Sequence, residues 1–368
     1  MSLETAILSH WIHTKGSPFG APYREQGTRL LRDATTEERK VYEPRFATRG
    51  SVRFTFIDLF AGVGGFRLAM QAHGGKCVFS SEWNEAAQKT YLANYGDVPF
   101  GDITTEETKE FIPDDFDVLC AGFPCQPFSR AGVSARVALN REDGFRDRTQ
   151  GTLFFEVLEI LRRKRPRVVF LENVRNLVLH DGGNTFRIIR ESIEAEGYSF
   201  QWKLIDASPL VPQKRVRCYM VCVRDGGDFQ FPVIDGCPRA LREILEPNPD
   251  PVYTISDRLW KGHQARTTRN IERGAGFTAF EANLDMPAHT LVARYYKDGK
   301  ECLVPQEGKN PRLLTKRECA RLQGYPEDFV LPKSRAEVYR QMGNSVAVPV
   351  LDRIAKCICE QLLGLLGE

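Results

Sequence analysis

The sequence has no apolar run long enough to cross a bilayer and no amino-terminal apolar stretch behind a basic start. Its ten cysteines show no paired spacing, and neither Cys357-x-Cys359 nor Cys218-x3-Cys222 has a second ligand pair nearby for zinc. These absences argue against a secreted disulfide scaffold and predict no metal, no membrane partner and a reduced, cytoplasmic protein. The formal net charge of +3 is too small to indicate nucleic-acid binding by itself.

Internal repeats and low-complexity tracts are also missing, so a solenoid or a fibrous protein is not expected. The 368 residues, of which 42% are apolar, suffice for one large domain with its own core and a smaller second domain. Residues 1–52 are mixed in charge and predict an extension, with a short helix near residues 36–41, that carries no motif for a role.

A strand, a glycine turn and a helix open the main part of the chain. The β-prone run 54–60 ends in Ala61-Gly62-Val63-Gly64-Gly65, and a helical pattern follows over residues 66–73. This order is typical of nucleotide-binding folds, because glycine admits a ligand close to the backbone and the helix start offers free N–H groups. The spacing departs from Gly-x-Gly-x-x-Gly, which argues against a nicotinamide enzyme. A tight turn that binds nothing is the alternative.

Acidic residues follow the next two predicted strands. Glu82 and Trp83 end the strand 76–81, where a carboxylate accepts hydrogen bonds from ribose hydroxyls and an indole stacks on adenine. Asp102 lies in a third predicted strand end, residues 100–103, and is placed to take an adenine amino group. The alternatives are a Glu82 that caps the next helix and an ordinary turn aspartate.

One cysteine stands at a predicted strand end. The apolar run 118–121 leads into Gly122-Phe123-Pro124-Cys125-Gln126-Pro127-Phe128-Ser129, which places Cys125 where open α/β sheets hold their ligands. A thiol there is a candidate nucleophile, and a small buried apolar side chain is the alternative. The polar loop 130–151 that follows predicts a lid over the site, or else a plain surface loop.

Charged residues mark two further strands. Glu172 ends the buried run 168–174, so it is either a capping carboxylate or an acid held in the same crevice as Cys125. Arg215 and Arg217 alternate with Val216 at the period of a strand and should point to one face, toward a negative group. A solvated basic edge is the alternative.

Basic residues gather in two places. The cations at residues 162–165 stand at the end of a predicted helix before a proline, where they stabilise the helix terminus. The segment 257–273 carries an excess that suits a surface for phosphates: Arg258, Lys261, His263, Arg266, Arg269 and Arg273.

The stretch around Cys125 resembles the proline-cysteine loop of the DNA cytosine C5 methyltransferases of the bacterial restriction-modification type. Similar motifs recur in the family's order from Phe54 to Pro349, with residues 1–50 and 226–300 covered less. The resemblance implies an α/β fold: a mostly parallel, doubly wound sheet of the S-adenosylmethionine-dependent methyltransferase type, with a smaller, mainly irregular or β target-recognition domain. It implies four segments: an extension (1–52), a catalytic cofactor-binding domain (53–225), a target-recognition domain (226–325) and a return segment with a last helix (326–368).

The same resemblance assigns the site residues. The S-adenosylmethionine pocket would be formed by Phe60, Gly62, Gly64, Glu82, Trp83, Asp102, Ile103, Pro124, Asn344 and Val346. The catalytic group would be Cys125 as nucleophile, Glu172 as partner of cytosine N3, and Arg217 and Arg215 as orienting charges.

The implied activity is methyl transfer from S-adenosylmethionine to C5 of a flipped-out cytosine in double-stranded DNA. The enzyme would be a monomer, serving a restriction-modification system whose endonuclease it does not bind stably. Residues 290–299 look like those of enzymes whose sites begin with two cytosines. The alternatives are a transfer-RNA cytosine-5 methyltransferase of the same fold and a DNA binder that has lost catalysis.

Overall fold

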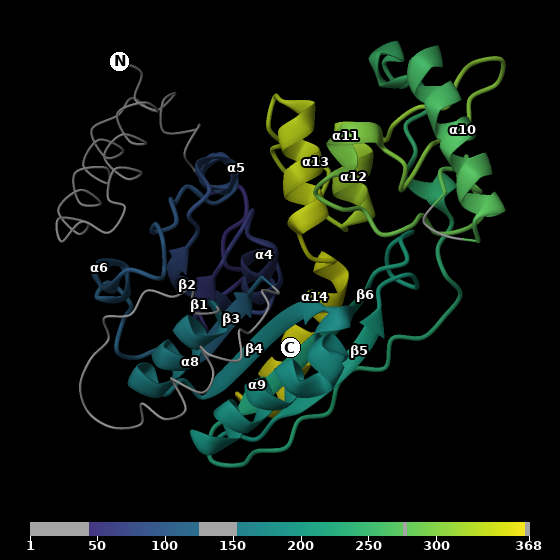
Figure 1. Cartoon of the computed structure of the whole chain (residues 1–368). Coiled ribbons are helices and arrows are strands. Elements are labelled where there is room, and N and C mark those ends of the chain that lie inside the picture. Colours follow the sequence, from purple (N-terminus) through teal and green to yellow (C-terminus); the bar gives the residue numbers. More distant parts are fainter. Residues whose placement is uncertain (1–43, 125–152, 275–277, 365–368) are drawn as a thin grey trace, which may run out of the picture.

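A computed structural model describes residues 44–124, 153–274 and 278–364 of the chain. These residues form a large lobe around a β-sheet and a small lobe, residues 241–344, beside it (Figure 1). Cys125, the predicted lid 130–151 and the predicted helix near residues 36–41 lie outside the described residues.

A six-stranded sheet forms the centre of the large lobe, with the strand order β2-β1-β3-β4-β6-β5. β1 to β4 run parallel, whereas β6 is antiparallel to both of its neighbours, so the predicted mostly parallel sheet is confirmed. The chain order reverses between β1 and β3, and in such sheets the ligand crevice lies outside the carboxyl ends of the strands at that point. The strands are β1 (Phe54–Leu59), β2 (Gly75–Ser81), β3 (Val118–Gly122), β4 (Val168–Val174), β5 (Gln201–Asp206) and β6 (Val216–Val223).

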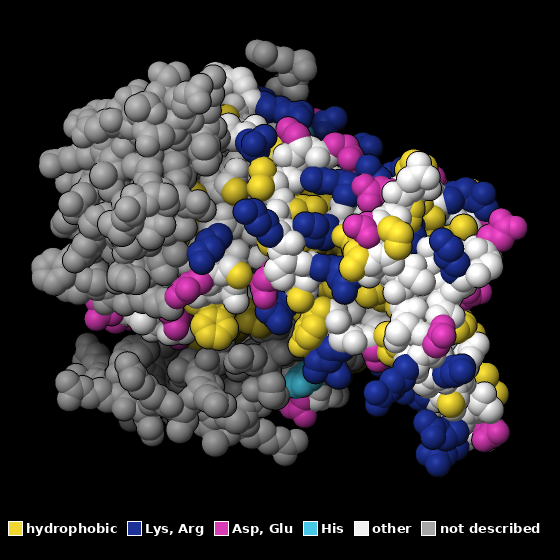
Figure 2. Space-filling model, turned by 90° about the horizontal axis from the view of Figure 1, so that it is seen from above, with side chains coloured by type: hydrophobic (Ala, Val, Ile, Leu, Met, Phe, Trp, Pro, Cys, Tyr) yellow, Lys and Arg dark blue, Asp and Glu magenta, His cyan; other side chains and the backbone are white. Residues whose placement is uncertain are grey.

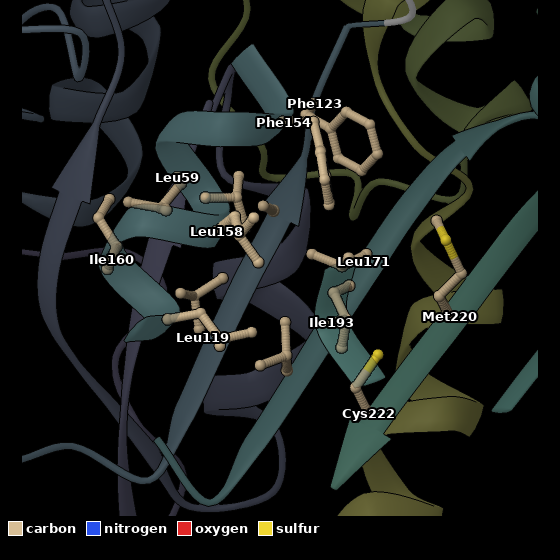
Figure 3. Close-up of a cluster of buried hydrophobic side chains, with 14 of the residues drawn as sticks. Leu59, Leu119, Phe123, Phe154, Leu158, Ile160, Leu171, Ile193, Met220 and Cys222 are labelled. Carbon is tan, nitrogen blue, oxygen red and sulfur yellow. The ribbon is translucent and has the colours of Figure 1, made fainter. Parts of the chain in front are cut away.

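Helices cover both faces of the sheet, as a doubly wound fold requires. One hydrophobic cluster joins α8 and α9 to one face; Figure 3 shows Leu158 and Ile193 of these helices pointing at Leu119 and Leu171 of the sheet. A second cluster joins α4 and α14 to the opposite face. The helices of this lobe are α4 (Gly65–Gln71), α5 (Glu85–Tyr95), α6 (Glu106–Lys109), α8 (Leu153–Lys164), η1 (Arg175–Val178), η2 (His180–Gly183), α9 (Asn184–Ala195) and α14 (Val348–Gln361).

The small lobe has a core of its own, built around Tyr295, Leu314 and Tyr339. Isolated β-bridges, such as Glu281 with Leu303, connect its irregular segments. This core continues into α5 of the large lobe through Tyr91 and Tyr95, so the two lobes pack directly on each other. Its helices are η3 (Leu241–Ile244), η4 (Pro251–Tyr253), α10 (Asp257–Glu272), α11 (Tyr295–Asp298), α12 (Lys316–Leu322) and α13 (Arg335–Asn344).

The third strand predicted at residues 100–103 is wrong. Phe100 forms only a single bridge with Ser81, because the chain turns immediately afterwards. The carboxylate of Asp102 accepts a hydrogen bond from the Thr104 N–H at 3.0 Å, and α6 starts shortly after that turn. The segment therefore adds one bridge to the edge of the sheet and no seventh strand.

Two negative findings concern the described part of the chain. It contains no helix of sufficient length and hydropathy to span a membrane. Nor do its histidine, cysteine and acidic side chains come together anywhere in a group of three that would hold a metal ion.

Candidate active site

The glycine turn after β1 is fixed by close packing. Gly64 precedes α4 with φ of 85°, a left-handed conformation that glycine adopts without strain. A Cβ on Gly64 would overlap the ring of Tyr95, whose hydroxyl donates a hydrogen bond to the Gly64 carbonyl at 2.7 Å. Phe60 and Gly62 also have positive φ, of 55° and 56°. Sequence and packing therefore agree that this turn needs glycine.

Glu82 ties that turn to the end of β2. One carboxylate oxygen accepts the N–H of Gly62 at 2.9 Å, and the other accepts the N–H of Asn84 at 2.8 Å. Burial raises the pKa of Glu82, and these N–H donors oppose the shift. The neighbouring Trp83 is 72% exposed, so a face of its indole is available for stacking. Glu82 therefore holds the N–H of Asn84, the residue that caps α5, as well as the turn. Its predicted hydrogen bonds to ribose hydroxyls stay a prediction.

Asp102 and Ile103 lie beside Glu82. The N–H of Glu82 donates to the Phe100 carbonyl at 2.8 Å, which brings the segment after Phe100 to the edge of the same crevice. Ile103 is buried, whereas Asp102 is half-buried and accepts the local hydrogen bond from Thr104. Phe100 thus brings this segment near Glu82, and the parts predicted for Asp102 and Ile103 in a nucleoside site stay predictions.

The junction between α13 and α14 packs against the first residue of α4, next to the glycine turn. A Cβ on Gly65 would overlap Val346 and would lie 3.0 Å from the hydroxyl of Tyr325. That hydroxyl hydrogen-bonds the Ser345 side chain at 2.7 Å. Asn344 is the last residue of α13 and is exposed. Val346 therefore lies at the glycine turn, although most of the chain separates the two in sequence, and Asn344 stands two residues before it.

Glu172, in β4, lies beside the end of β3, the strand that leads to Cys125. It is paired in register with Gly122, and a Cβ on Gly122 would lie 3.7 Å from Oε2 of Glu172. The next residue, Asn173, donates from its amide to the Phe123 carbonyl at 2.8 Å. Pro124 follows and is exposed. The described chain thus reaches Pro124, the residue before Cys125. The buried carboxyl of Glu172 lies beside Gly122, three residues before Cys125.

Arg217 pairs with Glu172, with 3.2 Å between Nε and Oε1. Burial raises the pKa of Glu172, and the charges of Arg217 and Arg215 oppose the shift. Within the described residues, the other oxygen of Glu172, Oε2, accepts no hydrogen bond. A carboxyl in this setting can hold a proton and donate it to a ligand.

Arg215 lies deeper in the protein. It is 2% exposed and donates to the carbonyls of Leu291 at 3.1 Å and Gly343 at 3.3 Å, and also to that of Ser345. Burial and the charge of Arg217 lower its pKa to about 9. Both arginines lie near enough to Glu172 to act on its charge, but only Arg217 is paired with it, and the hydrogen bonds of Arg215 go to main-chain carbonyls. Its burial rules out the alternative of a solvated basic edge.

Sequence reasoning missed three supporting residues. Asn173 was visible inside the Glu-Asn-Val sequence, but nothing there indicated its bond to Phe123. Tyr95 and Tyr325 act through contacts between segments far apart in the chain, which leave no local signal.

The two basic segments differ in the structure. The cations of the α8 end are ion-paired: Arg162 with Glu196, and Lys164 with Asp114. The segment 257–273 forms α10, in which His263 is buried and its ring bonds the Asp298 carbonyl at 2.9 Å. Figure 2 shows Lys and Arg side chains over the small lobe at the right. Those of this segment that are exposed are Arg258, Lys261, Arg266, Arg269 and Arg273.

Comparison with known proteins identifies the family of this chain. The model of the C-5 cytosine-specific DNA methylases matches residues 54–360, which contain every predicted site residue. The chain belongs to this family. It is therefore a DNA cytosine methyltransferase, and the family and its fold imply the use of S-adenosylmethionine.

Several relatives of this enzyme are named type II methyltransferases. The type II methyltransferase M.SsoII of Shigella sonnei is 45% identical, with 87% of this chain and 83% of the relative covered. M.HpaII of Haemophilus parainfluenzae is 41% identical, with 88% and 94% covered. The crystal structure of S. pombe Dnmt2 methyltransferase is 19% identical and superposes with a TM-score of 0.65 over 84% of this chain and 98% of that one. At that identity the structural match supports the fold alone.

The residues of the pocket fit S-adenosylmethionine. The turn at Gly64 is packed against the buried ring of Tyr95, where a larger residue would not fit, and so keeps the backbone after β1 in a fixed position. Glu82 offers buried carboxylate oxygens, which can accept from ribose hydroxyls, and Trp83 offers an exposed ring for the adenine. A hydrogen-bond acceptor for the ribose and an aromatic ring for the base, two residues that are adjacent in sequence, are the groups that a nucleoside ligand requires.

Proposed function

We propose that this enzyme methylates C5 of a cytosine extruded from double-stranded DNA, through a temporary bond between Cys125 and C6 of the base. The observation that carries the proposal is the Glu172–Arg217 pair at the end of β4, in register with the strand that leads to Cys125. A buried acid beside a candidate thiol is what addition to a pyrimidine ring requires.

The cofactor would be held by the glycine turn, Glu82, Trp83, Asp102 and Val346, with Phe60, Gly62, Ile103, Pro124 and Asn344 around them. S-adenosylmethionine supplies an electrophilic methyl group. The protein's own task is to make C5 of cytosine nucleophilic, because the unmodified ring is too weak to attack that group.

Cys125 and Glu172 would activate the ring together. The thiolate of Cys125 adds to C6 while the Glu172 carboxyl gives its proton, or a hydrogen bond, to N3. Electrons displaced from the C5–C6 double bond then make C5 the carbon of an enamine. C5 takes the methyl group from the sulfonium, whose sulfur leaves as a neutral thioether. A water molecule would then accept the C5 proton while the thiolate of Cys125 leaves C6 and N3 returns its proton to Glu172, which restores the ring. The raised pKa of Glu172 supports this role, since it keeps the carboxyl protonated at higher pH.

Arg217 would orient the base and stabilise charge from its place against Glu172. Because C5 is out of reach inside a duplex, the base must be flipped out, and the loop 130–151 is the candidate to close over it. The small lobe, with the exposed cations of α10, would meet the DNA backbone.

The biological setting would be a restriction-modification system, since several relatives are named type II methyltransferases. We propose a monomer in the cytoplasm that protects host DNA from a cognate endonuclease without binding it stably. The recognised site would begin with two cytosines, an expectation that rests on residues 290–299.

The test is to express the chain in a host that lacks DNA cytosine methylation. Sequencing of methylated cytosines should find one short motif modified throughout the genome, and mass spectrometry of the nucleosides should find 5-methylcytosine. N4-methylcytosine or methylated adenine in the DNA would contradict the mechanism. Methylation confined to the host's transfer RNA would instead favour the alternative substrate.

A further inference from the structure

The two lobes are joined by main-chain hydrogen bonds just before β6. The Lys214 N–H donates to the Ala288 carbonyl at 2.8 Å, and the Ala288 N–H donates to the Pro212 carbonyl at 2.9 Å. Between them Gln213, fully buried, accepts the Leu291 N–H and donates to the Leu322 carbonyl. This joint therefore fixes the start of β6 to two segments of the small lobe.

Arg215 extends the joint toward the cofactor pocket. Its guanidinium holds the Leu291 carbonyl in the small lobe and the carbonyls of Gly343 and Ser345 at the end of α13. Hydrogen bonds from a charged donor are stronger than neutral ones, and a planar fork fixes the positions of its acceptors. One buried side chain thus sets the distance between the small lobe and the α13–α14 junction.

That junction is in direct contact with both lobes. On one side, a Cβ on Gly343 would overlap the main chain of Val292 and Ala293 in the small lobe. On the other side, Ser345 and Val346 press on the glycine turn, Ser345 through Tyr325 and Val346 through Gly65. A displacement of residues 291–293 therefore cannot leave the wall of the cofactor pocket unchanged.

We propose that Arg215 is a positioning residue that couples DNA binding by the small lobe to cofactor binding at the glycine turn. The inference rests on the proposed function, in which residues near Leu291 meet DNA. Bound DNA would fix the position of the Leu291 carbonyl, to which Arg215 donates. Because Arg215 also donates to the Ser345 carbonyl, it would fix the position of that carbonyl as well. Val346, the next residue, would then pack more closely on the glycine turn. Such coupling is reciprocal, so the cofactor must tighten DNA binding by the same factor.

The test compares affinities for S-adenosylhomocysteine, measured by calorimetry with and without an unmethylated duplex that carries the site mapped by sequencing. For the wild-type enzyme we expect the duplex to tighten binding about fivefold or more. Arg215→Lys, which cannot reach three carbonyls with one fork, should bring that ratio close to one. The matched control is Arg312→Lys, because Arg312 is also buried but pairs with Glu318 inside the small lobe. It should keep the wild-type ratio.

Tyr325→Phe provides a second test that leaves the buried charge in place. It removes the hydroxyl that bonds Ser345 but keeps the ring, and it should reduce the ratio in part. Its control, Tyr339→Phe, removes a bond to the Leu314 carbonyl within the small lobe and should have no such effect.

A wild-type ratio of one, or an unchanged ratio in Arg215→Lys, would overturn the coupling. If Arg215→Lys does not fold, an unchanged ratio in Tyr325→Phe alone would do so. These outcomes leave the proposed function intact as long as the wild-type enzyme methylates DNA. Failure of that methylation would instead count against the function itself.

Discussion

Two buried glutamates stand at strand ends in this enzyme, and their surroundings differ. Glu82, after β2, has both oxygens occupied by main-chain N–H groups. Glu172, in β4, has one oxygen near Arg217, and its other oxygen accepts no hydrogen bond within the described residues. Burial raises both pKa values. The comparison shows that the partners, more than burial, decide the role: Glu82 is suited to a fixed acceptor, and Glu172 to a group that exchanges a proton.

The largest effect should come from replacing Cys125, the candidate nucleophile. Cys125→Ser should lower turnover by about 10³-fold or more, because a hydroxyl is a far weaker nucleophile than a thiolate. Binding of S-adenosylhomocysteine and of DNA should remain close to wild type. Single-turnover methylation and calorimetry measure the two quantities separately, and a variant that still turns over at the wild-type rate would exclude the covalent scheme.

Glu172→Gln should lower kcat by about 10²-fold or more, because the amide has the shape of the acid but cannot supply its proton. Its effect on cofactor affinity should be small. The proton on Glu172 is lost as pH rises through its raised pKa, so the wild-type rate should fall on the alkaline side for this reason. The variant should lack that limb, and a pH profile identical to wild type would contradict the assignment.

Glu82→Gln should show the opposite pattern. Replacing one oxygen by an NH₂ group leaves the N–H of Gly62 or of Asn84 without an acceptor, which costs about 1–3 kcal/mol. Cofactor affinity should therefore fall about 5–100-fold, whereas kcat at saturating cofactor should change little. If both glutamine variants altered kcat and cofactor affinity alike, the distinction between the two glutamates would be lost.

Gly64→Ala tests how much the packing of the glycine turn against Tyr95 contributes to the free energy of unfolding. The substitution forces alanine into a left-handed conformation and drives its Cβ into Tyr95, so we expect a loss of about 2–4 kcal/mol in the free energy of unfolding. Gly226→Ala is the control, because Gly226 has the same φ of 85° but no neighbour within 4 Å of the added atom. It should lose only about 1–2 kcal/mol. Equal losses in urea unfolding would show that the Tyr95 contact is unimportant.

Much of this architecture could be predicted from local pattern. Apolar runs located the strands β1 to β4, and the alternation around Val216 indicated the start of β6. Glu82 and Glu172 were found because they lie at the carboxyl ends of such runs. The predicted strand at residues 100–103 failed because only Phe100 pairs before the chain turns. The contacts of Arg215 could not be predicted, since its acceptors at Leu291 and Ser345 come near it only when the two lobes pack together.

The most direct test of the central claim is mass spectrometry of the enzyme with S-adenosylmethionine and a duplex that carries 5-fluorocytosine at the target position. Fluorine cannot leave C5 as the proton does, so the bond to the enzyme should persist. The account predicts a covalent adduct that maps to the peptide containing Cys125 and is absent from Cys125→Ser. A methylated product with no adduct, or an adduct on another residue, would contradict it.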